Sequence, residues 1–387
     1  MADYTVNAVK ADLYGRDRYD VAAFVFGESV TMAGVFTQNA FCAAPVHIAK
    51  ANLANSPRAW LINTKSANAG TGQIGHDDAQ AVCAAFAEQA GLKPDQVLPF
   101  STGVIGQRLP LDKLHAALPS LISDDQDWDA AAQAILTTDT RVKPAQRRLQ
   151  IAGQTVTLQG IAKGSGMIQP NMATMLGFVV TNASIPQPDL QAALSAATDR
   201  SFNRITVDGD TSTNDACMLA ATGEGASIDA AHPEWAAFTA ALDELMVELA
   251  QLIVRDGEGA TKFVEIEVSG AASTEDAHQV AKTVAHSPLV KTALFASDAN
   301  WGRILAAVGR APIADLDVSK INIWIGDVKL VTDGAADADY TEEAGAAVFA
   351  QDDIGILIDL GAGSESTTVW TCDFSHEYVS INADYRS

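Results

Sequence analysis

Short apolar segments alternate with helical stretches along all 387 residues, and no flexible linker separates them. The chain has no internal repeat, no low-complexity segment and no Pro/Ser-rich tether. A chain of this length exceeds what one compact core usually holds, so two domains or two halves are expected. Because no tether is present, we expect the halves to be joined through a core. The alternation favours a mixed α/β (α+β) protein.

Apolar runs of four to nine residues predict strands, and longer runs with helical spacing predict helices. The predicted strands are Val21–Phe26, Ser29–Phe36, Ala59–Asn63, Val97–Phe100, Thr174–Asn182, Lys262–Val268, Asn322–Leu330 and Gly355–Leu360. Arg147–Ala152 and Gln154–Leu158 alternate around Gly153, which indicates a hairpin. The predicted helices are His76–Ala90, Trp128–Leu136, Gln187–Asp199 and the strongly amphipathic Trp235–Val254.

The composition limits the class of protein and its partners. Apolar residues make up 48% of the chain and charged residues 19%, which excludes a disordered protein. The net charge of -23 disfavours binding to nucleic acid or to anionic lipid, but a small anion can still bind in a locally basic pocket. The first residues do not resemble a signal peptide, and no apolar run is long enough to span a membrane.

The four cysteines do not form a recognisable metal or disulfide framework. Cys42, Cys83, Cys217 and Cys372 lie far apart and include no CxxC pair, which fits reduced core thiols in a cytoplasmic protein. Asp208-Gly209-Asp210 opens like a calcium loop, but the sixth position is Thr and the twelfth is Leu. We therefore expect no metal and no cofactor.

Common catalytic motifs are also absent from the sequence. There is no P-loop, no dinucleotide-binding glycine motif, no H-E-x-x-H and no G-x-S-x-G. The histidines are scattered and suggest no triad. Thr174 opens a predicted strand, where a β-branched residue is ordinary, so its chemistry alone does not mark it as functional.

Seven segments carry unusual residue strings. They are STGVIG (Ser101–Gly106), TTDT (Thr137–Thr140), KGSGMIQPNMATMLGF (Lys163–Phe178), FNRITVDGDTSTND (Phe202–Asp215), RDGEGATK (Arg255–Lys262), DANWGRI (Asp298–Ile304) and EYVSINADYRS (Glu377–Ser387). In this order they closely resemble the ornithine acetyltransferase (glutamate N-acetyltransferase, ArgJ) family. The resemblance runs from about Val35 to the last residue.

The resemblance implies a self-cleaving enzyme with an ArgJ/DmpA-like fold, a sheet sandwich flanked by helices. Scission between Ala173 and Thr174 would divide the chain into an α chain (1–173) and a β chain (174–387). The two chains would stay interlocked and assemble as α2β2. The oxyanion donors and part of the substrate site would lie in the α chain, and the N-terminal Thr nucleophile and the C-terminal tail of the site would lie in the β chain.

The resemblance also implies residue roles. Thr174 would be the nucleophile, and its freed α-amino group, with a pKa of about 7.7–8.0, would serve as its base. The Thr102 hydroxyl and the Gly103 N–H would stabilise the oxyanion. The implied substrate-binding residues are Thr137, Lys163, Thr174, Glu258, Asn382 and Ser387. A Lys ammonium suits a substrate carboxylate, and a Glu carboxylate suits the ornithine ammonium.

The implied reaction belongs to arginine biosynthesis and moves acetyl from N2-acetylornithine to glutamate through acetyl-Thr174. Whether acetyl-CoA is a second donor, which would make the enzyme bifunctional, stays open. An alternative is a self-processing amidohydrolase or aminopeptidase with the same nucleophile, in which water is the acceptor. A third hypothesis is a non-enzymatic anion-binding module built from Gly-rich loops.

Two local departures from the family pattern bear on backbone conformation. Lys65 and Ser66 stand where the family usually has Gly followed by Asn. Ala296 replaces a usual Gly, which would cost roughly 1 kcal/mol if that position needed a positive φ. The first ~20 residues also lack the family's usual opening.

Overall fold

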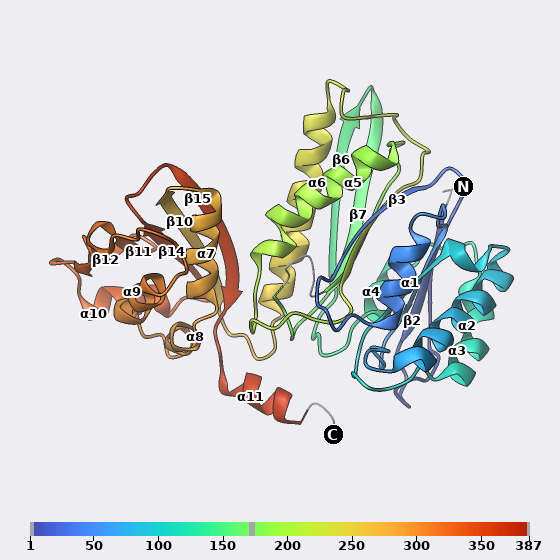
Figure 1. Ribbon diagram of the computed structural model, residues 1–387, viewed down its shortest axis with the longest axis horizontal. Helices are drawn as coiled ribbons and strands as arrows, with labels where there is room; N and C mark the ends of the chain where they lie inside the picture. Colours follow the sequence, from blue (N-terminus) through green and yellow to red (C-terminus); the bar gives the residue numbers. More distant parts are fainter. Residues whose placement is uncertain (1–3, 170–174, 385–387) are drawn as a thin grey trace. The chain divides into compact units, whose positions relative to one another are not determined.

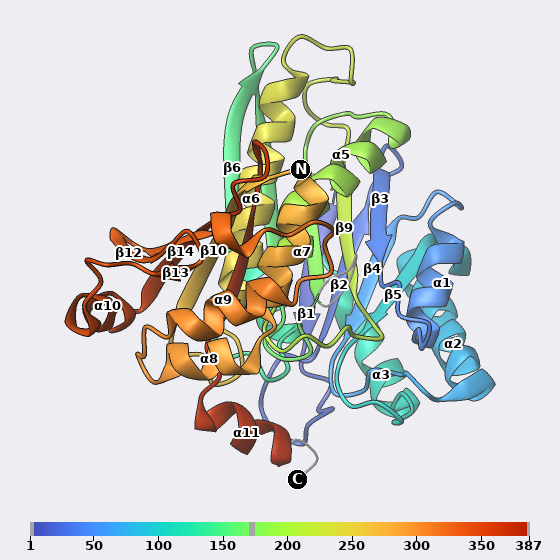
Figure 2. The same ribbon diagram turned by 60° about the vertical axis from the view of Figure 1, so that its left-hand side comes forward.

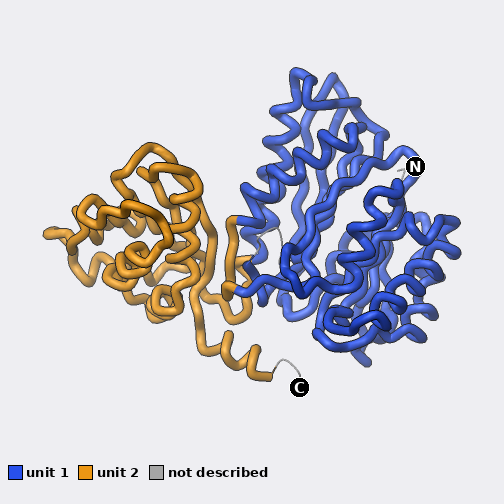
Figure 3. Tube along the Cα trace, viewed as in Figure 1, with its two compact units in different colours: residues 1–203, 210–253 blue, residues 204–209, 254–387 orange. Residues whose placement is uncertain are grey.

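The computed structural model describes residues 4–169 and 175–384. The chain forms two compact units, one of Met1–Asn203 with Asp210–Ile253 and one of Arg204–Gly209 with Val254–Ser387 (Figure 3). The second unit takes the short segment Arg204–Gly209 from the middle of the chain, where Ile205 forms a β-bridge with Trp370. Each unit has its own sheets and is described by itself.

Unit 1 contains two β-sheets. The first has the order β1-β2-β4-β5, formed by Tyr4–Val9, Val21–Phe26, Ala59–Asn63 and Val97–Ser101. The second has the order β3-β9-β8-β7-β6, formed by Thr31–Phe36, Ala216–Ala221, Leu176–Thr181, Gln154–Lys163 and Lys143–Ile151. In the second sheet, β8 and β9 are inserted between β3 and β7, which both precede them in the chain.

The two sheets of unit 1 face each other across an aromatic core. The ring centroid of Phe178 on β8 lies 5.9 Å from that of Phe24 on β2, 5.4 Å from Trp60 on β4 and 5.1 Å from Phe100 on β5. All four side chains are buried. Burial of each such ring stabilises the fold by roughly 1.5–3 kcal/mol. The four rings together therefore help to hold the two sheets against each other.

Helices cover the outer faces of the sandwich (Figures 1 and 2). Helix α2 (Gly72–Ala90) buries Val82 and Phe86 in a cluster with side chains of the first sheet. On the second sheet, α5 (Gln187–Arg200) is joined to β3 through Gln191, and Gly160 of β7 leaves room for Leu249 of α6 (Trp235–Arg255). The other helices of unit 1 are α1 (Ala44–Asn52), α3 (Leu111–Ala117) and α4 (Trp128–Ala134).

Unit 2 is a six-stranded sheet with helices packed against it. Its order is β13-β12-β11-β14-β10-β15, formed by Ala335–Ala336, Val328–Thr332, Asn322–Ile325, Asp353–Asp359, Phe263–Ala271 and Glu365–Cys372. On β10, Val264 and Ile266 are buried while Glu265 and Glu267 are exposed, so one face forms the core. The helices are α7 (Thr274–Ala285), α8 (Pro288–Phe295), α9 (Trp301–Gly309), α10 (Glu342–Phe349) and α11 (His376–Ala383).

The fold confirms the predicted sheet sandwich flanked by helices. Strands β2 and β4 have the predicted bounds, and the predicted hairpin turns at Ala152 and Gly153 with φ values of 49° and 75°. One prediction was wrong: Asn322–Leu330 is not one strand but the hairpin β11–β12. The reason is Gly326, whose φ of 51° places a turn inside the apolar run.

Candidate active site

The loop that follows β5 contains an unused backbone donor. The N–H of Thr102 donates to the Asn63 carbonyl (3.0 Å), and that of Val104 donates to the Lys65 carbonyl (3.0 Å). The Gly103 N–H between them has no acceptor in residues 4–169 and 175–384. Gly103 has a φ of 133°, and a Cβ there would lie 2.3 Å from the Lys65 carbonyl carbon. Only glycine fits this position.

The two departures from the family pattern have different structural outcomes. Lys65 takes a φ of 77°, the conformation that a glycine favours, and its N–H donates to the Tyr14 hydroxyl (3.0 Å). The Ser66 hydroxyl donates to the distant Gln107 carbonyl (2.7 Å). Ala296 needs no glycine, because its φ is -73° and the positive φ of 53° falls on Ser297.

Lys163, at the end of β7, joins two of the predicted site residues. Its ammonium donates to the Thr102 hydroxyl (3.2 Å) and to the Thr137 hydroxyl (3.1 Å), and the residue is 9% exposed. An ammonium can only donate, so the Thr102 oxygen accepts here and its own hydrogen remains available for another acceptor. Thr102, Gly103, Thr137 and Lys163 therefore form one polar site in unit 1.

A buried carboxylate that the sequence reasoning missed supports this site. Asp139 accepts from the N–H of Gly164 (2.7 Å), the N–H of Thr137 (3.0 Å) and the ammonium of Lys143 (2.7 Å). Burial opposes its ionisation, but the ammonium groups of Lys163 and Lys143 outweigh burial and hold the pKa of Asp139 at about 2. In the segment TTDT the family resemblance predicts only Thr137 as a site residue; the signal that could have indicated Asp139 is its carboxylate, two residues away.

The unit 1 site lies across from the beginning of β8. In the antiparallel pairing of β7 and β8, Lys163 is opposite Leu176. A Cβ on Gly164 would come within 3.6 Å of the Met175 side chain. The predicted nucleophile Thr174 and its neighbour Ala173 lie outside the described residues.

Unit 2 contains the other predicted substrate residues. The Asn382 amide of α11 donates to the Glu258 carboxylate (2.8 Å), and Glu258 is 6% exposed. The loop that holds Glu258 is pinned by Asp373, which accepts from the N–H groups of Thr261 (2.8 Å) and Lys262 (2.9 Å). Glu258 and Asn382 are thus brought together, whereas the predicted Ser387 lies outside the described residues.

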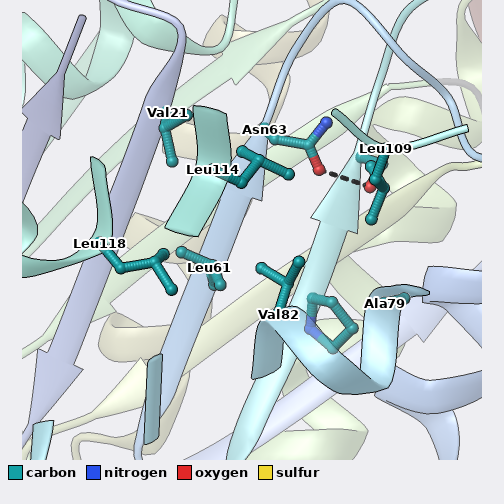
Figure 4. Close-up of a pocket in the computed structure, with 10 residues that line it drawn as sticks. Val21, Leu61, Asn63, Ala79, Val82, Leu109, Leu114 and Leu118 are labelled. Carbon is teal, nitrogen blue, oxygen red and sulfur yellow. Dashed lines mark hydrogen bonds between the residues drawn. The ribbon is translucent and has the colours of Figure 1, made fainter. Parts of the chain in front are cut away.

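Figure 4 shows a small pocket in unit 1. Its lining includes none of the residues of the polar site of unit 1, which are Thr102, Gly103, Thr137 and Lys163. Its lining is apolar apart from Asn63 and Ser101, which bond to each other (2.7 Å). Because its polar groups already satisfy each other and no charged side chain lines it, the pocket offers little to a charged substrate.

The cysteines do not form disulfides. All four are free; Cys42 is half-buried, and Cys83, Cys217 and Cys372 are buried, which confirms the prediction of core or near-core thiols. Within the described ranges, no group of three or more His, Cys, Asp or Glu residues could hold a metal ion. None of the described helices is both long and apolar enough to cross a membrane.

The fold and the site define a mixed α/β protein whose polar site combines two unused donors with a buried cation. The ArgJ family model matches residues 5–387. This chain therefore belongs to the ArgJ family, as the seven segments had indicated.

Similar proteins agree with this membership. The "Arginine biosynthesis bifunctional protein ArgJ" of Methylococcus capsulatus is 55% identical, with 96% of this chain and 92% of the relative covered. The protein of the same name from Pseudomonas fluorescens is 51% identical, with 100% and 97% covered. The crystal structure of the Bacillus halodurans protein of that name is 44% identical, has a TM-score of 0.52, and covers 54% of this chain and 99% of its own.

Proposed function

We propose that this chain is a self-processing acetyltransferase of arginine biosynthesis that moves acetyl from N2-acetylornithine to glutamate. The observation that carries the proposal is the pair of unused donors, the Thr102 hydroxyl and the Gly103 N–H, beside the buried Lys163 ammonium. Acyl transfer passes through an oxyanion that such donors stabilise. The family membership and the names of the two relatives support the substrate class and the pathway.

In the maturation step that we propose, the Thr174 hydroxyl attacks the Ala173 carbonyl carbon. The peptide C–N bond breaks, and an ester forms between Ala173 and the Thr174 oxygen. Water then cleaves the ester, which leaves a carboxylate on Ala173 and a free α-amino group and hydroxyl on Thr174. The match of 99% of the Bacillus halodurans chain to 54% of this one supports a division, since residues 174–387 are about that share.

In the transfer that follows, the Thr174 hydroxyl attacks the acetyl carbonyl, and the α-amino group takes its proton. Thr102 and Gly103 donate to the oxyanion. The C–N bond to ornithine breaks, the departing amine is protonated, and acetyl-Thr174 remains. The glutamate amine then attacks this ester and restores the hydroxyl.

The substrate contacts that we propose are those implied by the family resemblance. Lys163 and Thr137 would bind the α-carboxylate, and Glu258 with Asn382 would bind the ornithine ammonium; Ser387 is a further proposed contact. We further propose that the two chains assemble as α2β2. Whether acetyl-CoA is a second donor is decided by the acetylation assay described below.

Mass spectrometry of the purified protein tests the proposal. We expect two fragments divided at Ala173–Thr174 and an acetyl group on Thr174 after incubation with N2-acetylornithine alone. Thr174→Ala should remain one inert chain. A fully active intact chain, or acetyl transfer by Thr174→Ala, would refute it.

The assay of products separates the alternatives. An amidohydrolase would release acetate from N2-acetylornithine without glutamate, whereas the transferase needs glutamate to sustain turnover. A non-enzymatic anion-binding module would show neither cleavage nor an acyl adduct. Acetylation of glutamate by acetyl-CoA alone would establish the second donor.

A further inference from the structure

Three charged side chains, Asp139, Lys143 and Lys163, form a buried cluster that reaches Thr102 through Lys163. The side chains of Lys143 and Asp139 are both 0% exposed, and the lysine Nζ lies 2.7 Å from the Asp139 Oδ1. Lys163 acts on the same carboxylate through its charge. The formal charges of Lys143, Asp139 and Lys163 sum to one positive charge in a site shielded from water.

Asp139 serves as a structural anchor of the site. Its two oxygens hold the N–H of Thr137 and the N–H of Gly164, the residue that follows Lys163. Asp139 is ionised here, because its burial is outweighed by the ammonium groups of Lys163 and Lys143, which hold its pKa at about 2, and an ionised carboxylate is a strong acceptor. Alone beside Lys163, however, the carboxylate would cancel the positive charge that a substrate carboxylate needs.

We propose that Lys143 is a positioning residue for acetyl transfer, which neutralises Asp139 and thereby keeps the charge of Lys163 available to the substrate α-carboxylate. Lys143 acts through Asp139 and is not itself a contact of the substrate. This inference rests on the proposed function, in which Lys163 holds that carboxylate.

Two details support the assignment. Two of the three N–H groups of Lys163 are used by the hydroxyls of Thr102 and Thr137, and the third has no partner in the part of the chain that the structure describes. A bound carboxylate would also bring the formal charge of the cluster from plus one to zero. A buried charge is stable only when it is paired, so the net positive charge of the cluster favours an anion.

The test compares N2-acetylornithine with its α-methyl ester, which lacks the negative charge. The measured quantity is the ratio of kcat/KM for the acid to that for the ester, which does not depend on how much of each preparation is correctly cleaved. We expect Lys143→Met to lower this ratio at least about tenfold, because the uncompensated Asp139 charge then opposes Lys163.

A second substitution makes the test specific to charge. Lys143→Met combined with Asp139→Asn again leaves one positive charge, and we expect the ratio to return to within about threefold of the original. Arg147→Met is the matched control, because this cation lies on the same strand and pairs with Glu244 and Glu248 on α6. Its ratio should not change.

An unchanged ratio in folded Lys143→Met would overturn the inference. If that variant does not fold, the double variant decides: a restored preference supports the inference, and a lost preference refutes it. Failure of the proposed function looks different, since the unmodified enzyme would then show no acetyl transfer, or Lys163→Met would keep the preference for the acid.

Discussion

At the scale of single residues, the direction of its hydrogen bond with Lys163 leaves the Thr102 hydroxyl able to act as a donor. The Lys163 ammonium can only donate, so the Thr102 hydroxyl accepts from it and can donate onward. Thr102 is therefore the residue most open to test, because its hydroxyl proton has no acceptor among the described residues.

Thr102→Val keeps the shape of the side chain but removes this donor. We expect kcat for acetyl transfer to fall about 10²–10³-fold, the usual loss for one oxyanion donor. Thr102→Ser keeps the hydroxyl and should stay within about tenfold of the original in the same steady-state assay. Equal loss in both variants would mean that packing, not the donor, matters at this position.

Lys65 offers a test of backbone strain. Its φ of 77° costs a non-glycine residue roughly 1–2 kcal/mol, and its carbonyl lies where a Cβ on Gly103 would clash. We expect Lys65→Gly to raise the free energy of unfolding by about 0.5–1 kcal/mol, after the entropy of the unfolded chain is counted. Lys65→Val should lower it, and thermal unfolding compares the two. A stabilised Lys65→Val would rule out strain.

At the scale of elements, the segment between β15 and α11 holds the Glu258 loop in place. Asp373 accepts from the Thr261 N–H, the Thr261 hydroxyl (2.7 Å) and the Lys262 N–H. The residue is buried, so its loss leaves two backbone donors without an acceptor.

We expect Asp373→Ala to destabilise the protein by about 1–3 kcal/mol and to raise KM for N2-acetylornithine more than it lowers kcat. Asp353→Ala is the control, since it removes an exposed ion pair with Arg255, worth about 0.2–1 kcal/mol. Chemical denaturation and steady-state kinetics measure the two effects. A loss in kcat alone would argue against a role in holding Glu258.

Helix α7 contains a buried cation whose effect depends on pH. Burial lowers the pKa of Lys282 from 10.5 to about 7, and its ammonium donates to the Ile205 carbonyl (2.8 Å). The unfolded chain keeps this proton up to higher pH, so this group's contribution to stability rises from about pH 7 to 10. We expect Lys282→Met to be more stable by on the order of 2–3 kcal/mol at pH 6, with the gain shrinking toward pH 10. A gain that does not vary with pH, measured by denaturation, would contradict this.

Element prediction succeeded where a local pattern determines the outcome. The Ala152-Gly153 turn was predicted from the alternation on both sides of it. Helix α2 ends at Ala90, the predicted C-terminal bound, and Gly91 after it takes the left-handed conformation. The hairpin β11–β12 was missed because the apolar residues on both sides of Gly326 were taken as one run, although Gly326-Asp327 is a turn signal. The pairing of β8 with β7 and β9 depends on distant segments, which periodicity does not encode.

At the scale of the whole molecule, the order of the second sheet bears on the proposed cleavage. Strands β3, β7 and β6 belong to residues 1–173, whereas β8 and β9 belong to residues 174–387. The inserted strands pair with β7 on one side and with β3 on the other. The core around Phe178 likewise draws on both segments.

We therefore expect the two fragments to remain associated after cleavage. They should elute together in gel filtration under native conditions and separate only in denaturant, because separation breaks two strand pairings and the sandwich core. Light scattering of the native peak tests the proposed α2β2 mass. Fragments that separate without denaturant would contradict the interlocked arrangement.

The sequence by itself indicated the family and most strand segments, and it predicted a set of site residues: Thr102, Gly103, Thr137, Lys163, Glu258 and Asn382. Local strings and periods carry this information, since they depend on backbone conformation and on burial of one face. Only the tertiary structure decided that Lys163 reaches Thr102, 61 residues away, and that Asp139 and Lys143 set the charge beneath it. Such contacts follow from which strands pair and how two sheets stack, and these depend on the whole chain at once.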